Sequence, residues 1–188
     1  WGMGGRGCPG VTPDGTQDVL RASFQTWDAV EEMYVDFEDS GVTCVDTIGL
    51  DGIAPLNVAI WRDGAGGWPY TDRVVGLTTL TFDTETGGIV DADMEFNSED
   101  YDFSVDGDAS SYDLQQAVTH EVGHMLGLGH SAVAASVMYA TAGPGAVDKR
   151  ELTQDDIDGV VANHGLLSAP PAEPCGVATP RGTPDAPH

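Results

Sequence analysis

Apolar residues recur at helical spacing near the start of the chain and at alternating positions soon after. A helix is predicted from about Thr16, because four apolar residues follow at intervals of four, three and three. These residues are Leu20, Phe24, Trp27 and Val30. Residues 34–38 then alternate apolar and polar side chains and are followed by Ser40-Gly41, which predicts a half-buried strand that ends in a turn.

Three more strands and two more helices are predicted further along the chain. The strands are residues 56–61, 77–82 and 92–97. A second helix is expected after residues 110–113, where a capping box precedes a periodic apolar run. That run is Leu114, Val118, Val122 and Met125. A third helix is predicted to begin at Thr153, whose hydroxyl can cap the N–H of Asp156, and to end at Gly165.

The length of 188 residues suits one domain with a tail. We expect an irregular Gly- and Pro-rich lead-in over residues 1–15 and a compact domain over residues 16–167. Residues 168–188 contain six prolines and few apolar side chains, which predicts a linker or a tail. The sequence contains no apolar run of the length that a membrane span needs.

The segment from His120 to His130 reads H-E-x-x-H-x-x-G-x-x-H. His120 and His124 would lie one turn apart on a helix, so both imidazoles can reach one metal ion. Gly127 can end the helix and turn the chain, which would bring His130 to the same ion. Glu121 can reach a water on that metal without being a ligand. Three protein ligands and one open position are typical of a catalytic zinc site.

Two other interpretations of this motif are a zinc-binding module without catalysis and a zinc hydrolase that acts on non-peptide substrates. Glu121 argues against the first, because a purely structural site needs no base beside an open metal position. A chance match is also disfavoured, since three of the five histidines in the chain fall in this register. In the preferred mechanism, zinc lowers the pKa of a water and Glu121 accepts its proton.

The motif is followed by Ser131 and by Ser136-Val137-Met138-Tyr139, and together these residues resemble the metzincin metallopeptidases. Within that group the chain is most similar to the matrixins. The resemblance implies an α+β fold: a twisted mixed sheet of about five strands with three helices and an active-site cleft below an edge strand. It also implies a zinc-dependent endopeptidase in which Met138 packs beneath the zinc.

The segment Gly76–Phe82 resembles the matrixin strand that borders the substrate cleft. The resemblance therefore implies that Thr78, Thr79 and Leu80 bind the backbone of an extended protein or peptide substrate. Ala140 and Thr141 follow Tyr139 where matrixins have a proline that shapes the main specificity pocket, so the size of that pocket is left open.

The resemblance also bears on other metal ions. Asp72, Asn97 and Asp100 resemble matrixin calcium ligands, although surface acids in an acidic protein are an equal alternative. Matrixins usually hold a second, structural zinc, but Leu80 and Glu95 stand where two of its histidines would be. Because the sequence has no histidine before position 120, we expect one zinc per chain.

The cysteines fit a secreted protein. Cys8 and Cys44 flank the first predicted helix and are candidates for a disulfide, which leaves Cys175 over. The sequence around Cys175 faintly resembles the thiol segment of matrixin pro-peptides, but a plain tail cysteine is favoured over a role in latency.

The formal charge of −24 disfavours nucleic acid and anionic membranes as partners, and we expect a secreted monomer. Residues 74–148 contain no Lys or Arg, although the zinc motif lies among them. In a peptidase, such an acidic field would favour basic substrates. A solvated acidic face is an equally good explanation for most of these residues.

Overall fold

The structure is a computed structural model that describes residues 1–5, 7–45, 47–49, 56–64 and 67–165. Its main sheet has the strand order β2-β1-β3-β5-β4, in which β4 pairs antiparallel with β5 and the other pairs are parallel. The strands are β1 (Gly2–Gly4), β2 (Val42–Thr43), β3 (Val58–Arg62), β4 (Gly76–Phe82) and β5 (Ile89–Asn97). A small second sheet pairs β6 (Phe103–Ser104) with β7 (Tyr112–Asp113). The predicted α+β fold with a mixed five-stranded sheet is confirmed.

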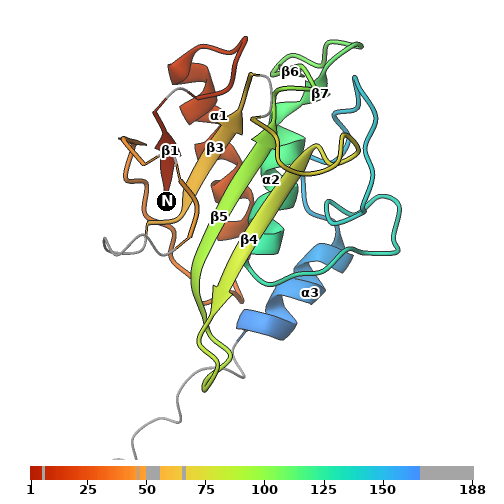
Figure 1. Cartoon of the computed structure of the whole chain (residues 1–188). Helices are drawn as coiled ribbons and strands as arrows, with labels where there is room; N and C mark the ends of the chain where they lie inside the picture. The colour runs from red at the N-terminus through yellow and green to blue at the C-terminus, as the bar shows by residue number, and fades with distance from the viewer. Residues whose placement is uncertain (6, 46, 50–55, 65–66, 166–188) are drawn as a thin grey trace, which may run out of the picture.

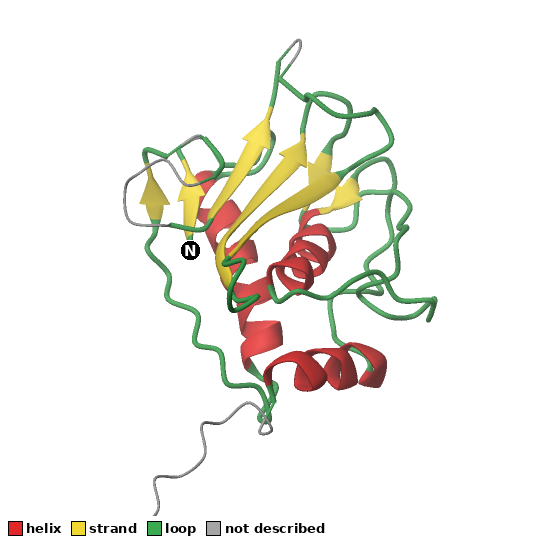
Figure 2. Ribbon diagram, turned by 60° about the horizontal axis from the view of Figure 1, so that its bottom comes forward, coloured by secondary structure: helices red, strands yellow, loops and turns green. Residues whose placement is uncertain are grey.

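Three helices complete the domain: α1 (Pro13–Asp28), α2 (Leu114–Met125) and α3 (Gln154–His164). Helices α1 and α2 pack side by side against one face of the sheet, and α3 lies beyond the lower end of α2 (Figures 1 and 2). The Trp27 indole is fully buried between the helices and donates a hydrogen bond to the carbonyl of Thr119 (2.8 Å). None of the helices in the described part of the chain is long and apolar enough to cross a membrane.

The first helix begins earlier than Thr16. Thr12 is its N-cap and accepts a hydrogen bond from the N–H of Gly15 (3.1 Å), and Pro13 occupies the first turn. Proline suits this position because its fixed φ is helical and its missing N–H would have no partner there.

Two element predictions near the N-terminus are wrong. Residues 34–38 are not a strand: their alternation arises because Val35 and Phe37 pack on the core while the segment runs along the surface. Conversely, Gly2–Gly4 lies within the expected irregular lead-in but forms β1, a buried strand between β2 and β3.

The second helix is capped by Asp113, not by the predicted box at residues 110–113. The Asp113 carboxylate accepts from the N–H of Gln116 (2.9 Å), and the two residues before α2 belong to β7. The prediction for the third helix is confirmed, with Thr153 as its N-cap and Gly165 at its end.

Cys8 and Cys44, the two candidates for a disulfide, are both free in the structure. Cys8 is buried in the core next to α1, and burial raises the pKa of its thiol to about 12, whereas Cys44 is exposed. Cys175 and residues 168–188 lie outside the described residues.

Candidate active site

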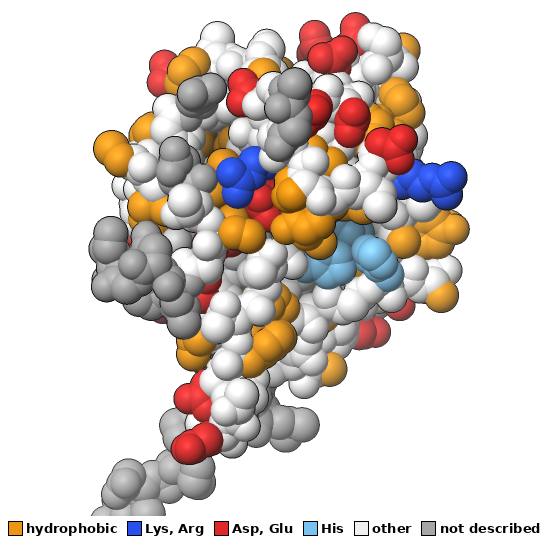
Figure 3. Space-filling model, in the orientation of Figure 1, with side chains coloured by type: hydrophobic (Ala, Val, Ile, Leu, Met, Phe, Trp, Pro, Cys, Tyr) orange, Lys and Arg blue, Asp and Glu red, His pale blue; other side chains and the backbone are white. Residues whose placement is uncertain are grey.

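The three histidines of the motif meet at the end of α2. His120 and His124 lie one turn apart, and Gly127, with φ +79°, reverses the chain so that His130 joins them. One ligand atom from each ring lies within 4.8 Å of the others, and the Nε2 atoms of His124 and His130 are 3.3 Å apart. Figure 3 shows the histidines as one cluster on the molecular surface, beside hydrophobic side chains.

The chain fixes the ring orientation of two of these histidines. His120 Nδ1 lies 2.7 Å from the carbonyl of Val137, and His124 Nδ1 lies 2.7 Å from the carbonyl of Leu128. Because a carbonyl only accepts, each Nδ1 carries the proton and each Nε2 presents its lone pair to the site.

Burial also keeps these two rings neutral. It lowers the pKa of His120 to about 4, with smaller contributions in the same direction from His124, His130 and Lys149, and it lowers the pKa of His124 as well. Neutral imidazole is the form that binds metal. Among the residues that the structure describes, the three converging nitrogen donors have no fourth protein ligand beside them, and they therefore fit a zinc ion with one open position.

Glu121 lies beside the triad and is almost fully buried. The Thr78 hydroxyl of β4 lies 2.7 Å from Glu121 Oε2 and 3.0 Å from the Glu121 carbonyl. Burial raises the pKa of Glu121 to about 7, while the hydrogen bond from Thr78 acts in the opposite direction. A β-carbon at Gly76 would lie 2.7 Å from Glu121 Oε1, so β4 approaches this carboxylate closely.

The three β4 residues predicted to bind substrate differ in position. Thr78 and Leu80 line a cleft of about 790 Å³ that also contains the three histidines and Glu121. Thr79 alternates to the other face of the strand, on the side of Tyr70. The sequence did not indicate that the Thr78 hydroxyl would contact Glu121, because only the tertiary packing of β4 on α2 brings them together.

Met138 packs directly beneath the histidine-bearing turn. A β-carbon on Gly123, which lies between His120 and His124, would be only 2.2 Å from Met138 Sδ. Met138 is 2% exposed, and its carbonyl accepts from the N–H of Ser131 (2.8 Å) next to His130.

Asp156 of α3 supports the segment Ser136–Met138, a role that the sequence did not indicate. Its carboxylate accepts hydrogen bonds from the Ser136 hydroxyl and from the N–H groups of Val137 and Met138. Since the Val137 carbonyl orients His120, α3 supports the metal-binding face through Asp156. The only signal in the sequence was its place three residues after Thr153, the cap of the helix.

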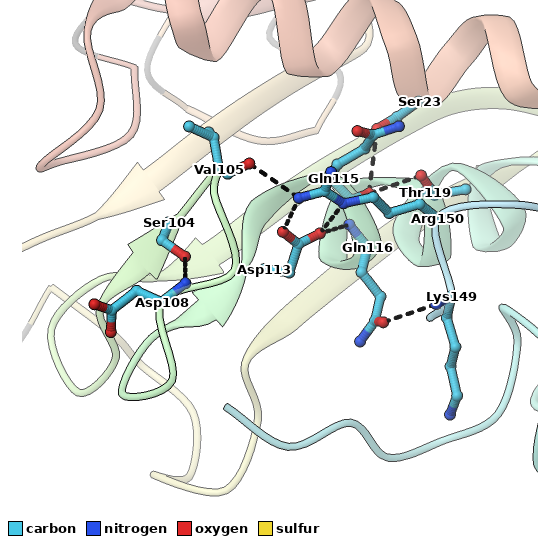
Figure 4. A network of polar contacts seen from close by, with 10 residues as sticks. All are labelled: Ser23, Ser104, Val105, Asp108, Asp113, Gln115, Gln116, Thr119, Lys149 and Arg150. Atoms are coloured by element: carbon cyan, nitrogen blue, oxygen red, sulfur yellow. Dashed lines mark hydrogen bonds and ion pairs between the residues drawn. The ribbon is translucent and has the colours of Figure 1, made fainter. Parts of the chain in front are cut away.

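A polar network stabilises the end of the cleft where α2 begins (Figure 4). The buried Asp113 carboxylate accepts from Arg150 Nε (2.8 Å), and Arg150 also reaches the carbonyl of Val105 (3.0 Å). The Gln116 side chain accepts from the N–H of Lys149 (3.1 Å). These hydrogen bonds connect Val105 and the start of α2 to Lys149 and Arg150, which lie in the segment before α3.

The three predicted calcium ligands, two aspartates and one asparagine, make hydrogen bonds within the protein. Asn97 and Asp100 are hydrogen-bonded to each other (2.9 and 3.1 Å), whereas Asp72 contributes its main-chain carbonyl to the Tyr101 hydroxyl. Within the described ranges, the histidine triad is the one group of three or more His, Cys, Asp or Glu residues arranged to share an ion. Calcium binding stays a prediction.

Glu95, at the position expected for a histidine of a second zinc site, has other partners. Its carboxylate accepts from Arg62 (2.7 Å) and from the Tyr70 hydroxyl (3.0 Å). A carboxylate engaged in this way is a poor candidate for a further metal ligand, which agrees with the expectation of one zinc per chain.

The helix-borne histidines, the buried glutamate and the supporting methionine together define a metzincin-type domain. Comparison with known proteins identifies its family: residues 8–165 match the family model described as Matrixin, and the chain belongs to that family.

Individual relatives agree with this assignment. The chain is 32% identical over 165 residues to Metalloendoproteinase 1-MMP of Arabidopsis thaliana, which covers 82% of this chain and 39% of that protein. It is 33% identical over 131 residues to neutrophil collagenase of Homo sapiens (69% of this chain, 27% of that protein). It is 43% identical over 117 residues to matrilysin of Homo sapiens (62% and 42%). The chain thus spans less than half the length of these relatives.

Proposed function

We propose that this chain is a zinc-dependent endopeptidase that hydrolyses peptide bonds of extended protein substrates. The observation that carries the proposal is the buried Glu121 carboxylate beside three converging histidine nitrogens. The relatives named metalloendoproteinase and collagenase support the same reaction class. A secreted location and a monomeric state stay predictions.

The zinc ion would be held by His120, His124 and His130, and when bound it supplies a Lewis acid for the scissile carbonyl and for the attacking water. Glu121 accepts the proton of that water and then delivers it to the leaving amine. The Thr78 hydroxyl holds the Glu121 carboxylate in place for both transfers.

Strand β4 provides a place for the substrate backbone. It is the edge strand of the sheet and pairs with β5 along one side only. Its other side borders the cleft that contains His120 and Glu121. An extended peptide can therefore add to β4 as a further strand, with its backbone hydrogen-bonded and its scissile bond next to the triad.

The test compares Glu121→Ala and His124→Ala with the unmodified chain in casein and gelatin digestion, together with metal analysis. Glu121→Ala should keep its zinc but lose at least ~100-fold in hydrolysis, because only proton transfer is removed. His124→Ala should lose both zinc and activity. Unchanged turnover in Glu121→Ala would refute the role given to this residue.

A panel of small esters, measured in parallel, separates the two alternatives. Hydrolysis of esters without hydrolysis of any protein would favour a non-peptide hydrolase. Zinc binding without either activity would favour a silent binding module.

A further inference from the structure

Lys149 places a buried positive charge in the wall of the cleft. The residue is 7% exposed and lines the same cleft as His120 and Glu121. Its Nζ donates to the carbonyl of Thr141 (3.0 Å) and lies 4.5 Å from the centre of the Tyr139 ring. Both of these contacts also line the cleft.

The position of Lys149 is fixed by its own backbone and by its neighbours. Its N–H donates to the buried Gln116 side chain of α2 (3.1 Å), and its side chain extends away from Asp113 and Arg150 (Figure 4). Gln116 lies one helical turn before His120 on α2. The ammonium is thereby held near the metal-binding face rather than free to move with the solvent.

This ammonium has no carboxylate partner among the residues that the structure describes. The adjacent Arg150 pairs with Asp113, and Arg21 and Arg62 also have acidic partners, but no such pair includes Lys149. An ammonium carries three donors, of which one is used by Thr141. Burial of an unpaired charge is unfavourable, so a carboxylate that entered this part of the cleft would gain a charge-assisted hydrogen bond.

We propose that Lys149 is a specificity-determining residue that makes the cleft prefer peptides with an aspartate or glutamate side chain next to the scissile bond. The inference rests on the proposed endopeptidase function, since it assigns the substrate class of the same cleft. It reverses the expectation of basic substrates that the charge of the sequence had suggested. The overall charge acts on every approaching peptide, whereas Lys149 acts only on a side chain that has entered the cleft.

The test uses the full zinc-loaded chain and peptides that differ at one position, with Glu, Gln, Leu or Lys in turn on each side of the cleaved bond. A charge-assisted hydrogen bond predicts a kcat/KM about tenfold or more higher for Glu than for Gln at one of these positions. In Lys149→Met, which keeps most of the aliphatic stem, this ratio should fall to about two or less. Lys149→Arg should retain a preference for Glu.

Arg73→Met is the matched control, because Arg73 also lines the cleft and carries the same charge, but is exposed. It should leave the Glu-to-Gln ratio within about twofold of the unmodified chain, as expected for a screened surface charge. A thermal melt of each variant identifies any loss of folding. If Lys149→Met does not fold, the Glu-to-Gln ratio is compared between Lys149→Gln, which should lose the preference, and Lys149→Arg, which should keep it.

Binding to the metal-free chain gives a second readout that does not depend on catalysis. Without zinc, a peptide carboxylate cannot bind the ion instead of Lys149. The Glu peptide should bind about tenfold more tightly than the Gln peptide, and Lys149→Met should remove the difference. If the chain hydrolyses peptides without a preference for Glu, or if the preference for Glu is still present in Lys149→Met, the role of Lys149 is refuted but the proposed endopeptidase function is not. Absence of all peptide hydrolysis would overturn the proposed function, while the binding difference would still decide the role of Lys149.

Discussion

Replacement of Asp156 by asparagine should strongly destabilise the domain, because one buried carboxylate accepts five hydrogen bonds. Its Oδ1 accepts from the Ser136 hydroxyl and the Met138 N–H (3.1 Å). Its Oδ2 accepts from the Val137 N–H (3.1 Å) and from the N–H and hydroxyl of Thr153 (2.8 and 2.7 Å). The side chain is 2% exposed, so water cannot replace these partners.

The size of the effect follows from the geometry of the amide. An asparagine has one acceptor oxygen, and its NH2 group must face one of the two sets of donors. The hydroxyls of Ser136 and Thr153 can rotate to accept from the NH2 group, but backbone N–H groups cannot. If the NH2 group takes the place of Oδ1, the N–H of Met138 loses its acceptor. If it takes the place of Oδ2, the N–H groups of Val137 and Thr153 lose theirs. Each orphaned buried donor costs about 1–3 kcal/mol, so we expect the free energy of unfolding to fall by about 1–3 kcal/mol in the first orientation and by about 2–6 kcal/mol in the second. That is a large part of the ~5–15 kcal/mol of a typical domain.

Urea unfolding of the zinc-loaded chain at pH 7 measures this loss, with Asp158→Asn as the control. Asp158 lies on the same helix and accepts only an exposed bond from Gln154 (2.8 Å), so its replacement should change stability by no more than about 0.5 kcal/mol. Equal stability of the two variants would refute the role given to the Asp156 carboxylate.

The pH dependence gives an independent check. Burial acts to raise the pKa of Asp156, but the hydrogen bonds from Ser136 and Thr153 outweigh it and hold this pKa below its ordinary value. The carboxylate therefore contributes its full stability above the unfolded pKa of about 3.9 and loses it as pH falls through the lower folded value. The difference between the unmodified chain and Asp156→Asn should be constant above about pH 5 and shrink below pH ~4.

Three further outcomes are expected. Gly76→Ala should lower peptide hydrolysis at least ~100-fold without loss of zinc, because the new β-carbon would lie 2.7 Å from Glu121 Oε1. Gly143→Ala is the control, because a β-carbon at Gly143 would have no neighbouring atom within 4 Å. Gly123→Ala should destabilise the domain by about 1–3 kcal/mol in urea unfolding, because its β-carbon would overlap Met138 Sδ at 2.2 Å. Elemental analysis after dialysis against metal-free buffer should find one zinc per chain, and two would contradict the expectation.

The triad could be predicted because its geometry is local. Two histidines four residues apart on a helix, and a glycine that ends the helix, determine the approach of the three rings within eleven residues. The structure has this arrangement, including the positive φ of Gly127. The clustering of the three histidines could therefore be predicted without knowledge of the rest of the fold.

Elements that depend on distant partners were the ones that failed. β1 has only three residues, two of them glycine, and it exists because Met3 lies between Val42 and Ala59 of the neighbouring strands. The alternation at 34–38 correctly indicated that every second side chain is partly buried against the core, but such burial alone does not supply a pairing strand. Hydrogen-bond partners come from tertiary structure, which a local pattern does not contain.

The positions of the charged residues in the fold could not be predicted from the sequence either, and they lead to a last prediction. The stretch without Lys or Arg ends at Arg73 on one side and at Lys149 on the other, and folding brings both of these residues to the cleft. The net charge of −24 repels an acidic peptide over a range of about 30 Å at ~0.01 M salt but only about 8 Å at ~0.15 M. The buried Lys149 is screened much less.

For a peptide with Glu beside the scissile bond, kcat/KM should therefore rise as salt is raised over this range, because repulsion fades faster than the local attraction. The ratio of kcat/KM between the Glu and Gln peptides should rise with it, since the Gln peptide carries one negative charge fewer and is repelled less at low salt. A peptide with Lys at the same position should show the opposite trend. If the ratio of Glu to Gln instead falls as salt is added, the attraction must come from exposed, easily screened charges such as Arg73. In that case the buried ammonium would not be the source of selectivity.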